Sequence, residues 1–314
     1  MKFLHLVRLC LVALPVLASG IAQAKDCKLE QVADLPVSWI DGNPIISISI
    51  AGAPARMLLD TGSQVSLLTD RAFEQMDLTG SVNAGGSQIL TGSYMNFLGS
   101  TEQVDDATMQ AVKIGHATVR DQVLILLRKI GGGSGPQQVD GVLGFDALEN
   151  FDIALDLGHG RIQLYALERC DTPQYPWKGL YAPVPLSHYD GVMPKLQVGV
   201  DGQALNMILD TGAARGELPA RELAQAGIKA EAVAASSSVF TDAVGHELRI
   251  QHEQFATFDV GGEEFQNAWI DVNQTVQTAT DTPFIGTLGE DYLTTHKVFI
   301  SNSTEQVLLG VSNQ

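Results

Sequence analysis

The chain contains the same loop twice, and each copy delivers an aspartate from an apolar run onto a Thr-Gly turn. The copies are residues 57–63 (MLLDTGS) and residues 207–213 (MILDTGA). A carboxylate at the end of an apolar strand is costly to bury unless it is paired or hydrogen-bonded. Two such aspartates, Asp60 and Asp210, therefore predict one site with a contribution from each copy.

Two further markers accompany each aspartate in the same order. The pattern Gly-x-Leu-Gly-x-Asp-x-Leu follows at residues 141–148 and again at residues 286–293. Between it and the aspartate, residues 112–116 (VKIGH) resemble residues 258–262 (FDVGG), and each is followed by an apolar strand-like run. Three ordered markers at similar spacing define an internal repeat, so we expect two structurally similar halves.

These motifs resemble the aspartic proteases, more closely the bacterial retropepsin-like group than the large pepsins. The resemblance covers nearly all of the chain after residue 24. It implies an all-β fold (mainly β with short helices), two-lobed and pepsin/retropepsin-like. Both lobes would lie in one chain, which would be a monomer.

The same resemblance implies an aspartic endopeptidase. Asp60 and Asp210 would be the catalytic pair, activating a water that hydrolyses a peptide or protein substrate without a metal or cofactor. The resemblance assigns support of the two catalytic loops to six residues. They are Thr61, Gly62, Ser63, Thr211, Gly212 and Ala213. The segments around Gly144 and Gly289 would brace the loops from behind.

A glycine-rich stretch follows the first loop, where the family carries a flap over bound peptide. Gly85, Gly86 and Tyr94 are therefore candidate flap or substrate-contacting residues. The alternative for Tyr94 is a surface aromatic on a hairpin.

The second loop departs from the family pattern. Gly216 stands where Ser or Thr is usual, and Arg215 brings a charge near the cleft. Arg215 would either bind an acidic substrate side chain or pair with Glu217, and we favour the ion pair. Ser63, but not Ala213, offers a hydroxyl that could hydrogen-bond the nearby carboxylate and favour its ionisation. This asymmetry leaves the pH optimum open between strongly acidic and near neutral.

The first 24 residues are typical of a signal peptide. Lys2 and Arg8 precede an apolar stretch, and Ala22-Gln23-Ala24 is a small-x-small cleavage site. We therefore expect export to the periplasm or secretion. No later run approaches the length of a membrane span, so stable membrane insertion is not expected. The expected divisions are residues 25–167 for the first lobe, 168–187 for a Pro-rich connector and 188–314 for the second lobe.

Two cysteines, Cys27 and Cys170, remain after cleavage at residue 24. An even pair in an exported protein predicts one disulfide, with two free thiols as the alternative. The formal net charge of −17 argues against nucleic-acid and anionic-membrane partners. His246 and His252 have no third ligand nearby in the sequence, so no metal site is expected.

Several secondary-structure elements can be predicted from the residue pattern. Alternation predicts strands at residues 44–50, 56–59, 195–200 and 204–209, and a hairpin within residues 153–165. Helices are expected at residues 69–78, with Thr69 as N-cap, at 145–151, and from Pro219 through Ala226.

A second function class remains open. A non-catalytic binding or inhibitor protein could use the same fold, since a fold does not fix a function. The presence of both aspartates favours the enzyme, because a pure binder has no reason to bury two like charges.

Overall fold

The computed structural model describes residues 28–78, 89–95, 101–109, 111–127, 138–167, 174–228, 237–241, 247–274 and 285–311. Strands predominate in these residues and the helices are short, which confirms the expectation of a mainly-β fold. The expected signal peptide, Cys27, Cys170, Gly85 and Gly86 lie outside the described residues. Tyr94 is described only in its backbone, within a strand.

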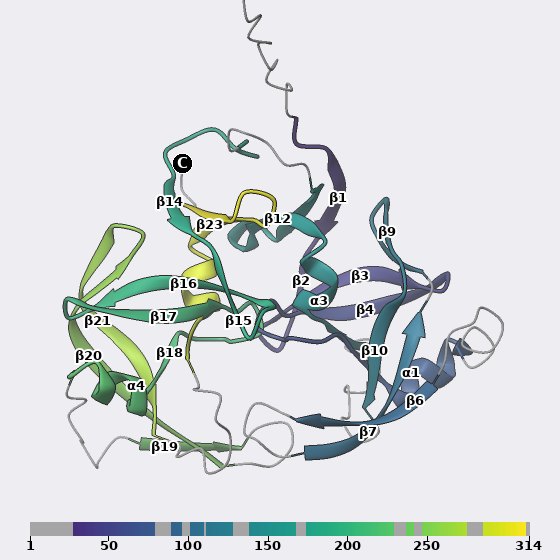
Figure 1. The fold of residues 1–314 in the computed structure, drawn as a ribbon, viewed down its shortest axis with the longest axis horizontal. Helices are drawn as coiled ribbons and strands as arrows, with labels where there is room; N and C mark the ends of the chain where they lie inside the picture. Colours follow the sequence, from purple (N-terminus) through teal and green to yellow (C-terminus); the bar gives the residue numbers. More distant parts are fainter. Residues whose placement is uncertain are drawn as a thin grey trace, which may run out of the picture.

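A ten-stranded sheet is formed entirely by the first half of the chain, to the right in Figure 1. Its strands are β2 (Ser38–Ile40), β3 (Asn43–Ile50), β4 (Ala53–Leu59), β5 (Leu67–Thr69), β6 (Ile89–Met95), β7 (Thr101–Met109), β8 (Val112–Ile114), β9 (Ala117–Val119), β10 (Gln122–Leu127) and β11 (Gly141–Leu143). The strand order is β6-β7-β10-β5-β11-β4-β3-β8-β9, with β2 paired to β3.

An eight-stranded sheet is formed by the second half, to the left in Figure 1. Its strands are β15 (Ser187–Tyr189), β16 (Met193–Val200), β17 (Gln203–Leu209), β18 (Glu217–Pro219), β19 (Ser237–Thr241), β20 (Glu247–Val260), β21 (Glu263–Asn273) and β22 (Gly286–Leu288). The order is β15-β16-β17-β22-β18-β21-β20-β19. An additional pairing of β16 with β20 closes most of this sheet into a near-barrel.

The two sheets repeat the same strand pairings around the aspartate loops. β4 pairs in parallel with β11, and β17 pairs in parallel with β22. In each half a short strand after the aspartate, β5 or β18, lies antiparallel to that bracing strand. The same short strand lies parallel to β10 or β21 on its other side. At the third marker, β8 pairs with β3 and β20 pairs with β16, both antiparallel. The three sequence markers therefore occupy equivalent positions in the two sheets.

A six-stranded sheet joins the halves and lies at the top of Figure 1. Its strands are β1 (Gln31–Pro36), β12 (Phe151–Asp156), β13 (Arg161–Ala166), β14 (Ala182–Pro185), β23 (His296–Ser301) and β24 (Gln306–Val311). The order β1-β13-β12-β23-β24-β14 puts three strands of each half side by side, with β12 paired to β23 at the centre. The expected hairpin of residues 153–165 is β12 and β13, joined by the short 3-10 helix η2 (Leu157–His159).

The helices are α1 (Asp70–Gln75), α3 (Phe145–Leu148), α4 (Ala220–Gln225) and α5 (Glu290–Leu293). Thr69 caps α1 as predicted, since its side chain accepts a hydrogen bond from the amide of Ala72.

Two helices are shorter than the sequence pattern predicted. The helix expected over residues 69–78 ends at Gln75, because Asp77 takes a left-handed conformation with φ of 51°. The helix expected over residues 145–151 ends at Leu148. The Asn150 side chain there bonds the carbonyls of Asp146 and Ala147, and Phe151 begins β12.

Part of the predicted connector is a strand. Ala182–Pro185 forms β14 at the edge of the six-stranded sheet, paired with β24. Proline lacks an amide donor, so an edge position is where Pro183 and Pro185 fit a sheet.

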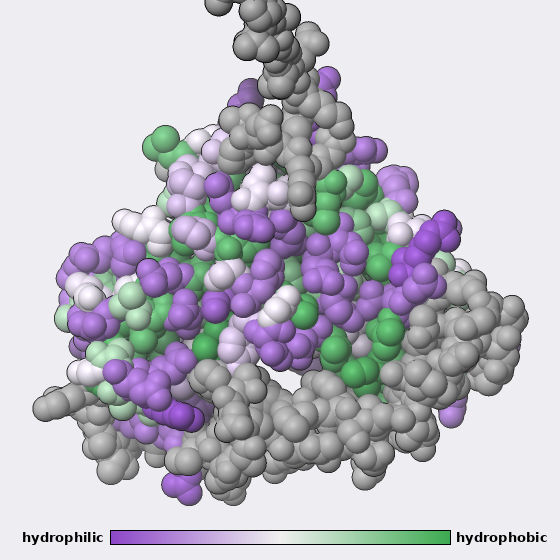
Figure 2. All heavy atoms as spheres, viewed as in Figure 1, coloured by the Kyte–Doolittle hydropathy of each residue, from purple (hydrophilic) through white to green (hydrophobic). Residues whose placement is uncertain are grey.

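One buried apolar cluster extends through both halves and includes the residues that precede each aspartate, Met57, Leu59, Met207 and Leu209. Hydrophilic side chains cover much of the face seen in Figure 2. Among the described residues, no helix is both long and apolar enough to span a membrane.

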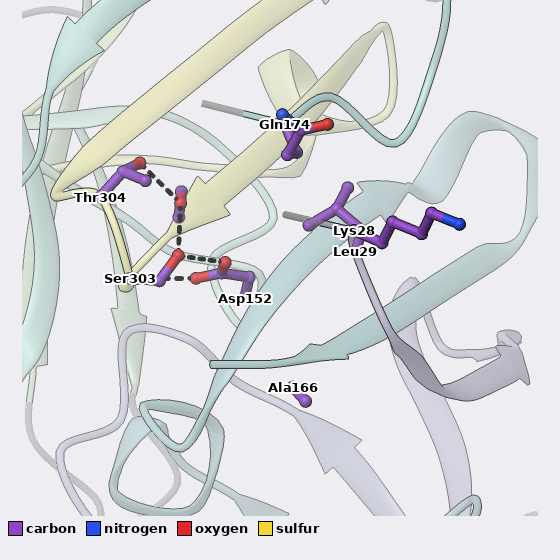
Figure 3. A pocket seen from close by; sticks show the side chains of 8 residues that line it. Lys28, Leu29, Asp152, Ala166, Gln174, Ser303 and Thr304 are labelled. Carbon is purple, nitrogen blue, oxygen red and sulfur yellow. Dashed lines mark hydrogen bonds between the residues drawn. The ribbon is translucent and has the colours of Figure 1, made fainter. Parts of the chain in front are cut away.

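A buried carboxylate fastens the six-stranded sheet across the halves. Asp152 of β12 is 2% exposed and accepts hydrogen bonds from the amide of Ser303 at 2.8 Å and from its hydroxyl at 2.5 Å. Figure 3 shows Ser303 beside Asp152, with Thr304 on the same turn between β23 and β24. The neighbouring Asn302 side chain donates to the carbonyl of Phe151 at 2.7 Å. Side chains of the second half thus hold β12 of the first.

Replacing Asp152 tests this connection between the two halves. We expect Asp152→Ala to lower the free energy of unfolding by about 1–3 kcal/mol, because it leaves the amide and hydroxyl of Ser303 without their acceptor. Urea denaturation followed by circular dichroism measures the change. The control is Asp34→Ala, which removes a solvent-exposed ion pair with Arg161 and should cost no more than about 1 kcal/mol. Equal losses in the two variants would contradict a special role for Asp152.

Candidate active site

In each half, the strand that ends at the aspartate pairs in parallel with a bracing strand, and the two aspartates, Asp60 and Asp210, lie at one site. Asp60 follows β4, and its amide donates to the carbonyl of Leu143 in β11 at 3.1 Å. Asp210 follows β17, and its amide donates to Leu288 in β22 at 3.1 Å. The segments around Gly144 and Gly289 therefore brace the two loops from behind.

The two loops are joined by four crossed hydrogen bonds, all made by Thr61 and Thr211. The amide of each threonine donates to the side-chain oxygen of the other at 3.0 Å. The hydroxyl of Thr61 donates to the carbonyl of Leu209 at 2.6 Å, and that of Thr211 donates to Leu59 at 2.7 Å. Both threonines are completely buried. The amide and the hydroxyl of each threonine are thus paired across the junction.

Glycine is required beside each aspartate because the opposite loop comes so close. A Cβ on Gly62 would lie 2.2 Å from the Cγ of Asp210, and one on Gly212 would lie 2.5 Å from the Cγ of Asp60. Each glycine amide also donates to the carboxylate of its own loop, Gly62 to Asp60 at 3.0 Å and Gly212 to Asp210 at 2.8 Å. The two carboxyl groups therefore lie close together, each packed against the glycine of the opposite loop.

The environment favours a proton on this pair. Burial and the charge of Asp210, which also shares a hydrogen bond with it, raise the pKa of Asp60 well above its usual range. Burial raises the pKa of Asp210 as well, while hydrogen bonds from the amides of Gly212, Ala213 and Gly62 and with Asp60 oppose the rise. Two neighbouring carboxylates ionise together only at high cost, so the pair retains one proton over a wide pH range.

The first loop is fastened by a half-buried carboxylate, that of Asp146. The hydroxyl of Ser66 donates to Asp146 at 2.6 Å, its amide donates to the same carboxylate at 3.1 Å, and its oxygen accepts from the amide of Gly144 at 3.0 Å. Gln122 adds a bond to Asp146 at 2.7 Å. Asp146 therefore ties the loop, the bracing segment and β10 together.

The second loop keeps only part of this arrangement. The amide of Gly216 donates to Asp291 at 2.9 Å, but glycine has no hydroxyl to repeat the bonds made by Ser66. Gly289 packs tightly on this loop, since a Cβ there would lie 2.5 Å from the backbone carbon of Arg215. The departure noted in the sequence thus removes bonds behind the loop and leaves the threonine junction intact.

Two expectations about loop side chains are not met. The hydroxyl of Ser63 donates to the carbonyl of Val65 at 2.8 Å, so its single proton is not directed at Asp60. Glu217 accepts a hydrogen bond from Asn273 at 2.8 Å instead of pairing with Arg215. In the described part of the chain, the exposed Arg215 forms no ion pair. In each case a nearby group, the carbonyl of Val65 or the side-chain amide of Asn273, forms the hydrogen bond in place of the partner expected from the sequence.

Two antiparallel hairpins occupy the positions expected for flaps. β6 pairs with β7 in the first half, and β19 pairs with β20 in the second. Tyr94 lies in β6 opposite Glu102. Its side chain, like Gly85 and Gly86, is outside what is described, so its contact with substrate stays a prediction.

Sequence reasoning assigned no role to Asp146, Asp291 or Glu290, although all three lie in the repeated Gly-x-Leu-Gly-x-Asp-x-Leu pattern. The recurring aspartate was the available signal for the first two. Among the described residues, no group of three or more His, Cys, Asp or Glu side chains is placed to hold a metal ion.

Comparison with known proteins supports the reading of the first half. Residues 46–147 match the family model described as aspartyl protease. The match includes Asp60, the bracing strand β11 and Asp146. A search of curated proteins found no match.

The threonine junction can be tested by removing one hydroxyl. We expect Thr61→Val to lower the free energy of unfolding by about 2–4 kcal/mol, because it leaves the amide of Thr211 and the carbonyl of Leu209 buried and unpaired. Thr118→Val, at an exposed strand position, is the matched control and should change stability by no more than about 0.5 kcal/mol. Guanidinium denaturation of the three proteins provides the comparison, and a stability of Thr61→Val equal to that of the control would refute the assignment.

The raised pKa of Asp60 also predicts how stability changes with pH. A carboxyl group whose pKa is higher in the folded than in the unfolded chain favours folding while protonated, and this contribution disappears as the pH rises through the folded pKa. Asp60→Asn removes the group that must ionise in a buried site. The stability of the variant relative to the wild type should therefore rise from pH 4 to pH 7. Denaturant unfolding at both pH values measures this difference. If the stability difference between Asp60→Asn and the wild type were the same at pH 4 and at pH 7, the pKa of Asp60 would not be raised by folding.

Proposed function

We propose that this chain, whose residues 46–147 match the aspartyl protease family, is an exported aspartic endopeptidase that hydrolyses peptide bonds of peptide or protein substrates. The single observation that carries the proposal is the close approach of two aspartates from separate halves, Asp60 and Asp210, each seated against the glycine of the opposite loop.

The proposed chemistry uses one proton and one water. With the pair holding a single proton, the charged member takes a proton from a water bound between the carboxyl groups, and the water attacks the carbonyl of the substrate peptide. The protonated member donates to the carbonyl oxygen. The pair then donates a proton to the leaving amine and takes one from a hydroxyl of the tetrahedral intermediate. The C–N bond breaks, the intermediate becomes a carboxylic acid, and the pair again holds one proton. Burial supports this role because it keeps the shared proton on the pair at mildly acidic pH.

The loops supply positioning. The buried bonds of Thr61 and Thr211 fix the separation of the two carboxyl groups, and positioning at this level is what general acid–base catalysis requires. The amides of Gly62 and Gly212 orient one oxygen of each carboxylate. No residue outside the two loops and their bracing segments is needed for the chemical step.

We further propose the organisation of the whole chain. Residues 1–24 direct export to the periplasm or the medium, and residues 25–167 and 188–314 form the two lobes of a pepsin/retropepsin-like fold. A disulfide between Cys27 and Cys170 would tie the N-terminal segment to the boundary between the lobes. The repeated strand pairings of the two sheets support a duplicated, two-lobed monomer.

The decisive experiment is hydrolysis of an unfolded protein by the purified mature chain. We expect cleavage between about pH 3 and pH 7, where the pair carries one proton. Asp60→Asn and Asp210→Asn should each lower the rate by on the order of 10²–10⁴-fold, as the loss of acid–base catalysis predicts. Asp121→Asn, on an exposed turn with φ of 54° that asparagine also tolerates, is the control and should retain activity. Mass spectrometry of the products gives the rates. A folded wild-type chain that binds peptides without cleaving them at any of these pH values would instead favour the binding protein.

A further inference from the structure

The two halves differ at the residue that follows each bracing glycine. The first half has Phe145 and the second has Glu290. The backbone amides of these two residues make equivalent hydrogen bonds. The amide of Phe145 donates to the carbonyl of Ser63, and the amide of Glu290 donates to that of Ala213, both at 2.8 Å. Phe145 is fully buried, and Glu290 is only 8% exposed. A carboxylic acid therefore occupies a position where the other half of the molecule buries an aromatic ring.

The side chain of Glu290 lacks the partners that a buried carboxyl normally has. Its Oε1 atom is buried and has no hydrogen-bond partner among the described residues. An unsatisfied buried polar atom destabilises the fold, and an apolar side chain would avoid this cost. Groups that weaken a fold in this way often serve the site beside them.

Glu290 lies within electrostatic reach of Asp210. Burial is the main cause that raises its pKa to about 7, and the charges of Asp210 and Asp291 add to the rise. Asp210 comes from the loop after β17, and Asp291 is the next residue of α5. Arg215, on the loop that α5 braces, acts on Asp291.

Another acid of the second half also interacts with Asp210. Glu217 of β18 senses the charges of Asp271 in β21 and of Asp210. The charges that act on Glu290 itself, those of Asp210 and Asp291, are both negative.

We propose that Glu290, a buried carboxyl group on the segment that braces the second aspartate loop, is a positioning residue whose negative charge retains the last proton on the Asp60–Asp210 pair and so sets the alkaline limit of activity. This inference rests on the proposed peptidase function.

The sign of the effect follows from Coulomb's law. A negative charge near the pair opposes the loss of its last proton, so an ionised Glu290 moves the alkaline limb of activity to higher pH. Glu290 is neutral in the acidic range, where the pair gains its second proton, and has no charge to act with there. Removal of the charge should therefore move one limb of the pH profile and leave the other in place.

The test is the pH dependence of kcat/KM for Glu290→Gln, which keeps the shape of the side chain and removes its charge. We expect the alkaline limb to move down by about one pH unit, the shift typical of one neighbouring charge, with the acid limb unchanged. Glu290→Asp, which restores the charge, should return the limb toward its wild-type position. An alkaline limb that stays in place, or two limbs that move together, would overturn the proposal.

Glu222→Gln is the matched control. Burial also raises the pKa of Glu222 to about 7, but the charges that act on it are those of Arg221 and Lys195 and not that of Asp210. This variant should keep both limbs of the wild-type profile. A shift equal to that of Glu290→Gln would show that any lost acid has this effect and would overturn the assignment.

A second measurement separates this inference from the proposed function. The Cγ signals of Asp60 and Asp210 can be titrated by ¹³C NMR in aspartate-labelled protein, whether or not the chain cleaves peptides. The upper step of the pair should occur at lower pH in Glu290→Gln than in the wild type, and unchanged steps would overturn the role of Glu290. Should Glu290→Gln fail to fold, Glu290→Met, a neutral side chain of similar length, is measured by the same titration.

Discussion

The arrangement of this molecule depends on the crossed hydrogen bonds between Thr61 and Thr211. These bonds join residues 150 positions apart, and each threonine uses both its amide and its hydroxyl. They can form only if the two loops meet with sub-ångström accuracy in a dry environment. The bracing strands behind the loops and the six-stranded sheet that joins the halves provide that accuracy. Without the junction, the two carboxyl groups would be held only by their own separate halves.

Bringing the two carboxyl groups together costs free energy, and the threonine junction has to offset it. Asp60 and Asp210 are like charges brought close together at half-buried positions, and the pKa of each is raised because full ionisation of the pair is unfavourable there. The amides of Gly62 and Gly212 offset part of this cost by donating to the carboxylates. The remainder is a local instability that folding must tolerate and that the proposed peptidase chemistry would use.

Much of the fold could be predicted because its signals are local or repeated. Alternation in β3 and β16, the N-cap at Thr69 and the two aspartate loops all depend on neighbours in sequence. The helix ends were missed because they depend on single backbone conformations and side-chain caps, at Asp77 and Asn150.

The partners of loop side chains were also missed, for a different reason. Ser63 bonds the carbonyl of Val65, and Glu217 bonds Asn273, which arrives on a strand that is distant in sequence. Sequence identifies which groups can form hydrogen bonds, but the three-dimensional fold decides which donor is nearest. The role of Asp146, which joins three segments, could likewise be recognised only once those segments were placed together.

The differences between the two halves have a consequence for the aspartate pair. Two identical chains would have to place the same residues behind both loops. Here Ser66 has no hydroxyl counterpart at Gly216, and Phe145 is matched by the acid Glu290. The first loop is therefore fastened more firmly, while the second aspartate has a titratable neighbour. A single chain that carries both loops can give its two aspartates different surroundings, and such a difference is what allows one of them to hold the shared proton preferentially.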